Sequence, residues 1–240
     1  MNIDLAFSSP DLKTKDLTGR IVAVIDVLRG TSTMISALAH GCAGIIPVLT
    51  VDEARQIAAE QKDLELLLGG ERNALPIEGF DLSNSPRDYR PEKVRGRTIV
   101  MTTTNGTQAL LAAQTAAKVY IGAFLNLSAL AQRLQEEGGD VTLVCSGKQG
   151  LFCMEDTVCG GGIIDSLEKD GIPLTPSDTA AAAKILYEYY EGDIYGMIST
   201  CEWGRYLLSI GLERDLRLCA QIDSLKIVPV FKEGKIYLDR

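Results

Sequence analysis

Short apolar runs alternate with longer amphipathic stretches through the first 150 residues of the chain. Apolar runs bounded by polar turns are typical of strands that are buried on both faces, as in parallel sheets. The strands that this pattern predicts are Ile21–Asp26, Ile45–Leu49, Leu64–Leu68, Ile99–Met101, Val119–Ala123 and Val141–Cys145. The helices predicted between them are Met34–His40, Thr50–Gln61, Gln108–Ala117 and Asn126–Glu137. This alternation predicts an α/β fold of three layers, α/β/α, around a mostly parallel or mixed sheet.

The same β-α-β-α-β pattern occurs twice, in residues 20–95 and 96–150. An offset of 76 residues places Gly30 on Gly106 and the helix cap Thr50 on the helix cap Asn126. An internal duplication is one interpretation of this match. The recurrence of a common supersecondary pattern is the other. We carry the duplication as a hypothesis of two pseudo-repeats within one domain that covers residues 1–240.

Residues 156–240 are predicted to be mainly helical. The expected helices are Asp156–Lys169, Asp178–Tyr190 behind the cap Ser177, Ser199–Ser209 and Leu212–Ala220. Two further apolar runs, Lys226–Phe231 and Lys235–Asp239, flank Glu233-Gly234 and predict a terminal β-hairpin. Pro229 lacks a backbone N–H and marks the first of these runs as an edge strand.

Bulk composition narrows the classes of partner and compartment. The formal net charge of −8 disfavours nucleic acid and anionic membranes as partners. The chain shows no signal peptide and no apolar run long enough to span a bilayer. Its six cysteines form no disulfide framework, so we expect reduced thiols in a cytoplasmic protein.

Hydroxyl and amide side chains crowd the segment Thr102–Thr107, between a predicted strand and a predicted helix. Backbone N–H groups at a helix N-terminus lack intrahelical partners and attract anions. Ordinary N-capping would explain one such side chain, whereas this segment supplies five. The segment therefore favours an anion site, with plain capping as the alternative.

Three more polar loops follow predicted strands: Asp26–Thr33, Gly70–Arg72 and Ser146–Gly150. Because ligands of α/β sheets bind beyond the carboxyl ends of the strands, we expect these loops to meet the first one there. Carboxylates beside phosphate donors indicate a hard cation such as Mg²⁺. The long segment Pro76–Pro91 is predicted to be an ordered functional loop, because its length is unusual inside a domain.

Each charged candidate residue could instead have a purely structural role. Asp26 could cap a helix, Arg29 and Arg72 could form surface ion pairs, and Glu155-Asp156 could complement a helix dipole. The chain has a single histidine, which disfavours histidine-dependent nucleophiles. It also lacks the phosphate-binding GxxxxGK[ST] loop and the dinucleotide-binding GxGxxG fingerprint.

Five ordered motifs resemble those of the 2-phosphosulfolactate phosphatase family. They are VIDVLRGTST (24–33), GGER (69–72), GFDLSNSP (79–86), TTTNGT (102–107) and CSGKQGLFCMEDTVCGG (145–161). The chain departs from residues common in that family at Gly30, Ser83, Lys148 and Cys153. The resemblance implies Mg²⁺-dependent hydrolysis of 2-phospho-3-sulfolactate to sulfolactate and phosphate, a step towards coenzyme M in methanogens.

Combining the resemblance with the loop chemistry assigns candidate roles. The candidate catalytic residues are Asp26, Arg29, Glu71, Arg72 and Asn105. The candidate substrate-binding residues are Thr31, Ser32, Asn84, Ser85, Thr103, Thr104, Gly106, Thr107, Ser146 and Lys148. The candidate metal ligands are Asp26, Glu155 and Asp156.

Two mechanisms and two rival functions stay open. Attack on phosphorus by a metal-positioned water is one mechanism, and a covalent phosphate on Asp26 is the other. The expected partner is a small polyanionic phospho-acid, and a homodimer is one of the open assembly states. The rivals are a non-catalytic protein that binds a phosphorylated metabolite, and a transferase acting on a phosphosugar or nucleotide.

Overall fold

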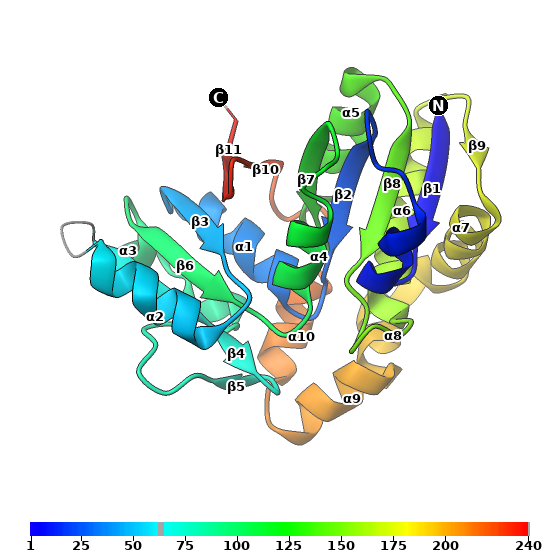
Figure 1. Ribbon diagram of the computed structural model, residues 1–240. Coiled ribbons are helices and arrows are strands. Elements are labelled where there is room, and N and C mark those ends of the chain that lie inside the picture. The colour runs from blue at the N-terminus through cyan, green and yellow to red at the C-terminus, as the bar shows by residue number, and fades with distance from the viewer. Residues whose placement is uncertain (62–64, 240) are drawn as a thin grey trace.

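A computed structural model describes residues 1–61 and 65–239. Over these residues it confirms the α/β fold, with helices covering both faces of one mixed sheet (Figure 1). The strands are β1 Asn2–Ala6, β2 Ile21–Ile25, β3 Gly44–Pro47, β4 Leu66–Arg72, β5 Leu75–Pro76, β6 Thr98–Thr102, β7 Lys118–Gly122, β8 Val141–Cys145, β9 Thr175–Pro176, β10 Pro229–Lys232 and β11 Lys235–Leu238. Their order in the sheet is β5-β4-β6-β3-β11-β10-β7-β2-β8-β1-β9. The predicted start of one strand at Leu64 lies outside the described residues.

The sheet consists of two parallel groups joined by the terminal hairpin. Strands β4, β6 and β3 are parallel to one another, as are β7, β2, β8, β1 and β9. The predicted hairpin β10–β11 is confirmed and lies between the groups, antiparallel to β7 and to β3. The edge-strand prediction from Pro229 is therefore wrong. The sheet accepts this proline because it is the first residue of β10, and pairing with β7 begins at Val230.

The two predicted repeats interlock within the sheet. Strand β6, from the second repeat, lies between β4 and β3 of the first, and β2 of the first lies between β7 and β8 of the second. The strand register agrees with the 76-residue offset. Leu66 of the first repeat pairs with Thr98 of the second, and the positions equivalent to them, Thr142 and Val22, also pair with each other. Duplication stays a hypothesis, but the repeats do not form separate halves.

Several helix boundaries differ from those predicted. The helices are α1 Gly30–Ala39, α2 Val51–Glu60, α3 Pro91–Val94, α4 Gly106–Ala112, α5 Leu127–Glu137, α6 Met154–Lys169, α7 Asp178–Tyr190, α8 Ile194–Thr200, α9 Glu202–Ser209 and α10 Glu213–Cys219. Helix α1 begins before Met34 because its polar first turn is bonded internally: Ser32 Oγ donates to Val27 O. The predicted helix Ser199–Ser209 is two helices, because Cys201 is extended and its Sγ caps α9 by accepting from Gly204 N.

The core fills both sides of the sheet. Helices α5, α6 and α7 pack against one face of the β7–β1 group, and α1 and α4 pack against the other. Glycine lets α6 approach α7 closely, because a Cβ on Gly161 would lie 2.0 Å from Ala183 O. Strand β1 was not predicted. Its signal was present in the sequence, because Ile3 and Leu5 alternate with polar residues, and both are buried in the structure. None of the helices that the structure describes has the length and apolar character needed to cross a membrane.

Candidate active site

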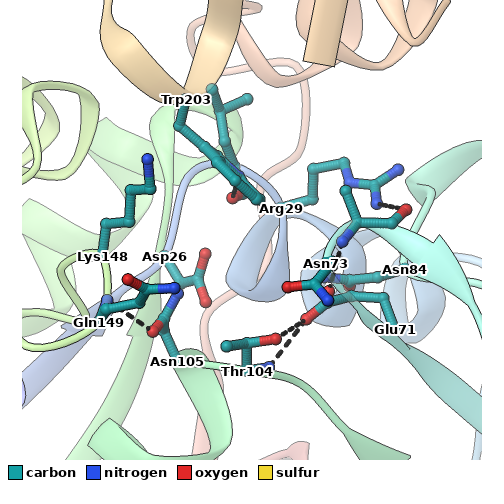
Figure 2. A pocket seen from close by; sticks show the side chains of 12 residues that line it. Asp26, Arg29, Glu71, Asn73, Asn84, Thr104, Asn105, Lys148, Gln149 and Trp203 are labelled. Carbon is teal, nitrogen blue, oxygen red and sulfur yellow. Dashed lines mark hydrogen bonds between the residues drawn. The ribbon is translucent and has the colours of Figure 1, made fainter. Parts of the chain in front are cut away.

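A cavity lies where β2, β4, β6 and β8 end, so the four predicted polar loops meet there (Figure 2). The side chains around it are Asp26, Leu28, Arg29, Glu71, Asn73, Ala74, Asn84, Thr104, Asn105, Lys148, Gln149 and Trp203. An adjoining recess shares Asp26, Asn105 and Lys148 and adds Glu155 and Asp156. The arrangement therefore brings carboxylates, cations and carboxamides from distant parts of the chain to one place.

Asp26 lies between the N-termini of α1 and α4. Its Oδ1 accepts a hydrogen bond of 3.1 Å from Gly30 N. A Cβ on either Gly30 or Gly106 would lie 2.5 Å from Asp26 Oδ2, so both glycines make room for this carboxylate. Burial, with a smaller contribution from the charges of Glu71 and Glu155, raises the pKa of Asp26 to about 7, although the hydrogen bond from Gly30 N opposes the shift.

Glu155 and Asp156 belong to the first turn of α6 and are buried. Asp156 accepts from Val27 N at 2.8 Å and from Gly147 N at 3.3 Å, and so ties the ends of β2 and β8 to α6. Burial raises the pKa of Asp156 well above its ordinary value, and the charges of Asp26 and Glu155 add to the shift. The pair thus faces the recess, rather than only complementing a helix dipole at the surface.

No three histidine, cysteine, aspartate or glutamate side chains of the described residues are close enough to hold a metal ion by themselves. Mg²⁺ does not need such a cage, because it is usually held by one or two carboxylates together with phosphate oxygens and water. Asp26 and Glu155 meet this requirement where the cavity joins the recess. A divalent cation there would also relieve the mutual repulsion of the buried carboxylates.

Arg29 is buried in an ion pair and is not at the surface. Its Nη1 donates to Asp215 Oδ2 at 2.7 Å and its Nη2 donates to Ala74 O at 2.8 Å. Asp215 also accepts from Ser85 Oγ at 2.7 Å, so Ser85 braces this pair and does not line the cavity. Sequence analysis missed Asp215, because it lies in α10, 186 residues from Arg29, with no local signal.

Glu71 braces two loops. Its Oε1 accepts from both the backbone N and the Oγ1 of Thr104, each at 2.8 Å, and its Oε2 accepts from Ala74 N at 2.7 Å. The hydroxyl hydrogen of Thr104 is therefore directed at Glu71. Arg72 donates to Thr102 Oγ1 at 2.9 Å and to two backbone carbonyls, and it does not line the cavity.

Most of the predicted hydroxyl groups have structural partners. Thr103 Oγ1 accepts from Thr107 N, and Thr107 Oγ1 donates to Thr103 O. Thr31 Oγ1 and Ser32 Oγ donate to backbone carbonyls in the same way. Ser146 Oγ is buried without a hydrogen-bond partner among the described residues and does not line the cavity. Thr103 and Thr107 thus bond each other within the loop, and Thr104 and Asn105 are the residues of this segment that line the cavity.

Carboxamides line the cavity instead. Asn105 Oδ1 accepts from Gln149 N at 3.1 Å. Asn84 Oδ1 is buried and has no hydrogen-bond partner among the described residues, although Asn84 lines the cavity. Sequence analysis missed Asn73 and Gln149. Asn73 directly follows the GGER motif, and Gln149 lies within the predicted polar loop Ser146–Gly150, although neither was among the candidate site residues.

Lys148 and Trp203 line both the cavity and the recess. Lys148 Nζ lies 2.5 Å from Glu202 Oε1 and 5.2 Å from the centre of the Trp203 ring. Trp203 Nε1 donates to Leu28 O at 2.9 Å, which anchors α9 over the loop that carries Asp26. Glu202 is exposed, so the lysine ion pair is weak and its amine can exchange to an anionic ligand.

Comparison with known proteins identifies the relatives of this chain. The family model described as 2-phosphosulpholactate phosphatase matches residues 7–234. A probable 2-phosphosulfolactate phosphatase of Symbiobacterium thermophilum is 40% identical over 224 residues, covering 93% of this chain and 96% of the relative. Proteins with the same name from Clostridium acetobutylicum and Clostridium novyi are 39% and 41% identical, each over 98% of this chain and over 100% and 99% of their own lengths.

Proposed function

This chain belongs to the 2-phosphosulfolactate phosphatase family, and from that premise we propose that it hydrolyses 2-phospho-3-sulfolactate to 3-sulfolactate and phosphate with the help of Mg²⁺. The observation that carries the proposal is the single cavity in which Asp26 and Glu71 lie beside Arg29, Lys148 and several carboxamides. A hydrolase for a phosphate ester needs both a carboxylate side and an anion-binding side.

The charges of the cavity suit a substrate with three anionic groups. Buried carboxylates alone would repel such a substrate. Burial, and to a lesser extent the charges of neighbouring carboxylates, raise the pKa of Asp26 and of Asp156. Asp26 and Glu155 would hold Mg²⁺ at the recess. When bound, the ion supplies positive charge to the phosphoryl oxygens and so favours the transition state.

The residues of the chain would orient the substrate and exclude water. Lys148 can leave Glu202 for an anionic oxygen, and Asn105 offers the N–H bonds of its carboxamide. Arg29 keeps its charge beside the cavity while Asp215 fixes its position. Leu28 and Trp203 add apolar surface to the lining of the cavity, and water that they exclude would otherwise weaken the electrostatic interactions inside.

Phosphate release from synthetic 2-phospho-3-sulfolactate, measured with Mg²⁺ and with EDTA, tests the proposal. We expect release that depends on Mg²⁺ and falls at least about a hundredfold in EDTA, since charge stabilisation of this kind contributes several kcal/mol. 2-Phospholactate, which lacks the sulfonate, serves as the matched substrate and should react with a higher KM.

Other outcomes identify the rival functions. Tight binding of the phospho-acid without any phosphate release would favour a binding protein. Release that appears only when a sugar or nucleoside acceptor is present would favour a transferase. Undiminished hydrolysis in EDTA would remove Mg²⁺ from the proposal while leaving the phosphatase in place.

A further inference from the structure

Two equivalent tight turns face each other across the cavity. Arg72 pairs with Leu75, leaving Asn73-Ala74 as a two-residue turn, and Lys148 pairs with Leu151, leaving Gln149-Gly150. The 76-residue offset that relates the repeats places Asn73 on Gln149. Figure 2 shows both carboxamides directed into the cavity from opposite walls, with Asp26 between them in that view.

The backbone conformation at Gln149 is energetically unfavourable for glutamine. The φ angles are 52° and 65° for Asn73 and Ala74, and 53° and 79° for Gln149 and Gly150, as a type I′ turn requires. Asparagine and glycine tolerate positive φ, but glutamine has no such preference. The turn would therefore be more stable with another residue at position 149, which directs attention to what the side chain does.

The hydrogen bond that Gln149 makes to the rest of the protein comes from its backbone and not from its side chain. Its backbone N–H is the group that bonds Asn105 Oδ1. Its carboxamide is exposed and makes no hydrogen bond to another described residue, and the same is true of the carboxamide of Asn73. Both amides are thus available to a ligand, next to the buried and unpartnered Asn84 Oδ1.

We infer that Gln149 and Asn73 are specificity-determining residues whose amide N–H groups hold the acid groups of the substrate that are not transferred. This inference rests on the proposed function and deepens it. A three-carbon phospho-acid with two further acid groups needs donors on two sides of the reacting phosphate, and the paired turns provide them. Carboxamides suit this task because their N–H groups donate to anionic oxygens, yet carry no charge that would repel Mg²⁺ or pair with the buried carboxylates.

Gln149→Gly separates a ligand role from a structural one. The substitution keeps the backbone N–H and relieves the positive φ, so we expect a higher Tm by about 2–4 °C together with weaker ligand binding. Calorimetric titration with 3-sulfolactate should give a Kd at least about tenfold higher than that of the wild type, because a hydrogen bond to a charged group is lost. In turnover, KM should rise more than kcat falls, since the contact is made to a non-reacting group.

Glu233→Gly is the matched control. Glu233 occupies the same first position in the two-residue turn of the β10–β11 hairpin, with φ of 52° and a glycine after it, away from the cavity. This variant should show the same rise in Tm with an unchanged Kd. Asn73→Gly should weaken binding as Gln149→Gly does, with little change in Tm.

The inference is overturned if Gln149→Gly binds 3-sulfolactate as the wild type does, or if the wild type does not bind it. The proposed function fails on a different result, the absence of phosphate release from 2-phospho-3-sulfolactate by the wild type. A wild type that hydrolyses the substrate, combined with a Gln149→Gly variant whose KM is unchanged, would retain the function and remove Gln149 from recognition.

Discussion

The loop from β2 to α1 and the loop from β6 to α4 occupy equivalent places but carry different chemistry. The 76-residue offset places Asp26 on Thr102 and Arg29 on Asn105. Both loops end in a glycine that faces Asp26 Oδ2. The first loop thus supplies charged groups to the cavity and the second supplies neutral ones.

The two loops are also held in place differently. Arg29 is fixed by Asp215 from α10, far along the chain, whereas Asn105 accepts one hydrogen bond from Gln149 N in a neighbouring loop. A buried charge needs a charged partner, whereas a neutral polar group needs only one hydrogen bond. The helical C-terminal part therefore supports the charged loop through Asp215.

The largest difference between the loops should appear on replacing Asp26. Asp26→Asn keeps the shape of the side chain but removes its charge, and we expect kcat/KM for phosphate release to fall about 10²–10⁴-fold. Thr102→Val, the equivalent change in the neutral loop, should cost less than about tenfold, since Thr102 bonds only Arg72 and Leu49 O. Near-normal turnover by a folded Asp26→Asn variant would show that Asp26 takes no part in catalysis and that the charged loop is no more important than the neutral one.

The supports of the two loops should differ in stability. Asp215→Ala leaves Arg29 buried without its partner and should lower the free energy of unfolding by about 3–5 kcal/mol, measured in urea. Asn105→Ala should cost about 1 kcal/mol. The double variant Arg29→Met/Asp215→Leu should recover much of the loss. Equal costs for Asp215→Ala and Asn105→Ala would show that the charged loop needs no special support.

The two glycines should behave alike, despite the difference between their loops. Gly30→Ala and Gly106→Ala each place a methyl group about 2.5 Å from Asp26 Oδ2, and each should cost about 1–3 kcal/mol of stability with a parallel loss of kcat. Gly192→Ala is the control, because nothing lies within 4 Å of the added Cβ. A loss in only one of the two variants would show that Asp26 is held by one helix and not by both.

The pH dependence of stability should also distinguish the loops, because the second loop has no carboxylate at the position equivalent to Asp26. Because the pKa of Asp26 is raised from 3.8 to about 7 in the folded protein, the folded state binds more protons than the unfolded state between these values. Metal-free wild type should therefore lose stability relative to Asp26→Asn as the pH rises from about 4 to about 7, by at most about 1.4 kcal/mol per pH unit, and the difference should level off above pH 7. Urea unfolding at several pH values measures it. A difference that does not change with pH would show that Asp26 ionises normally.

Local patterns predicted those elements whose signals are local. The capping box of Thr50 and Glu53 and the cap Ser177 appear where the sequence placed them, because each needs only residues within one turn. Asn126 stands at its predicted cap position, but its amide donates to Ile121 O and Ile227 O instead of capping the helix. The polar loops after the strands were visible in the sequence as well, since parallel strands release their ligand-binding loops at one end.

Which side chain reaches the cavity could not be predicted in this way. A hydroxyl in Thr102–Thr107 looks the same in the sequence whether it faces a ligand, Glu71 or its own backbone. The choice depends on Glu71 near the end of β4, and the pairing of Arg29 depends on Asp215 in a distant helix. The position of the β10–β11 hairpin between β3 and β7 likewise depends on the order of strands in the sheet, for which the sequence has no local signal.

Local patterns in the sequence predicted most of the strands and helices, the polar residues at the strand ends and the family to which the chain belongs. These features depend on local periodicity and on short motifs, which can be recognised without knowing which distant residues they contact. Contacts in three dimensions were needed to establish that the repeats interlock, that Asp26 lies between two helix ends and that several carboxamides line the cavity. Those facts depend on contacts between residues far apart in the chain, where burial forces each polar group to take whichever partner the fold brings to it.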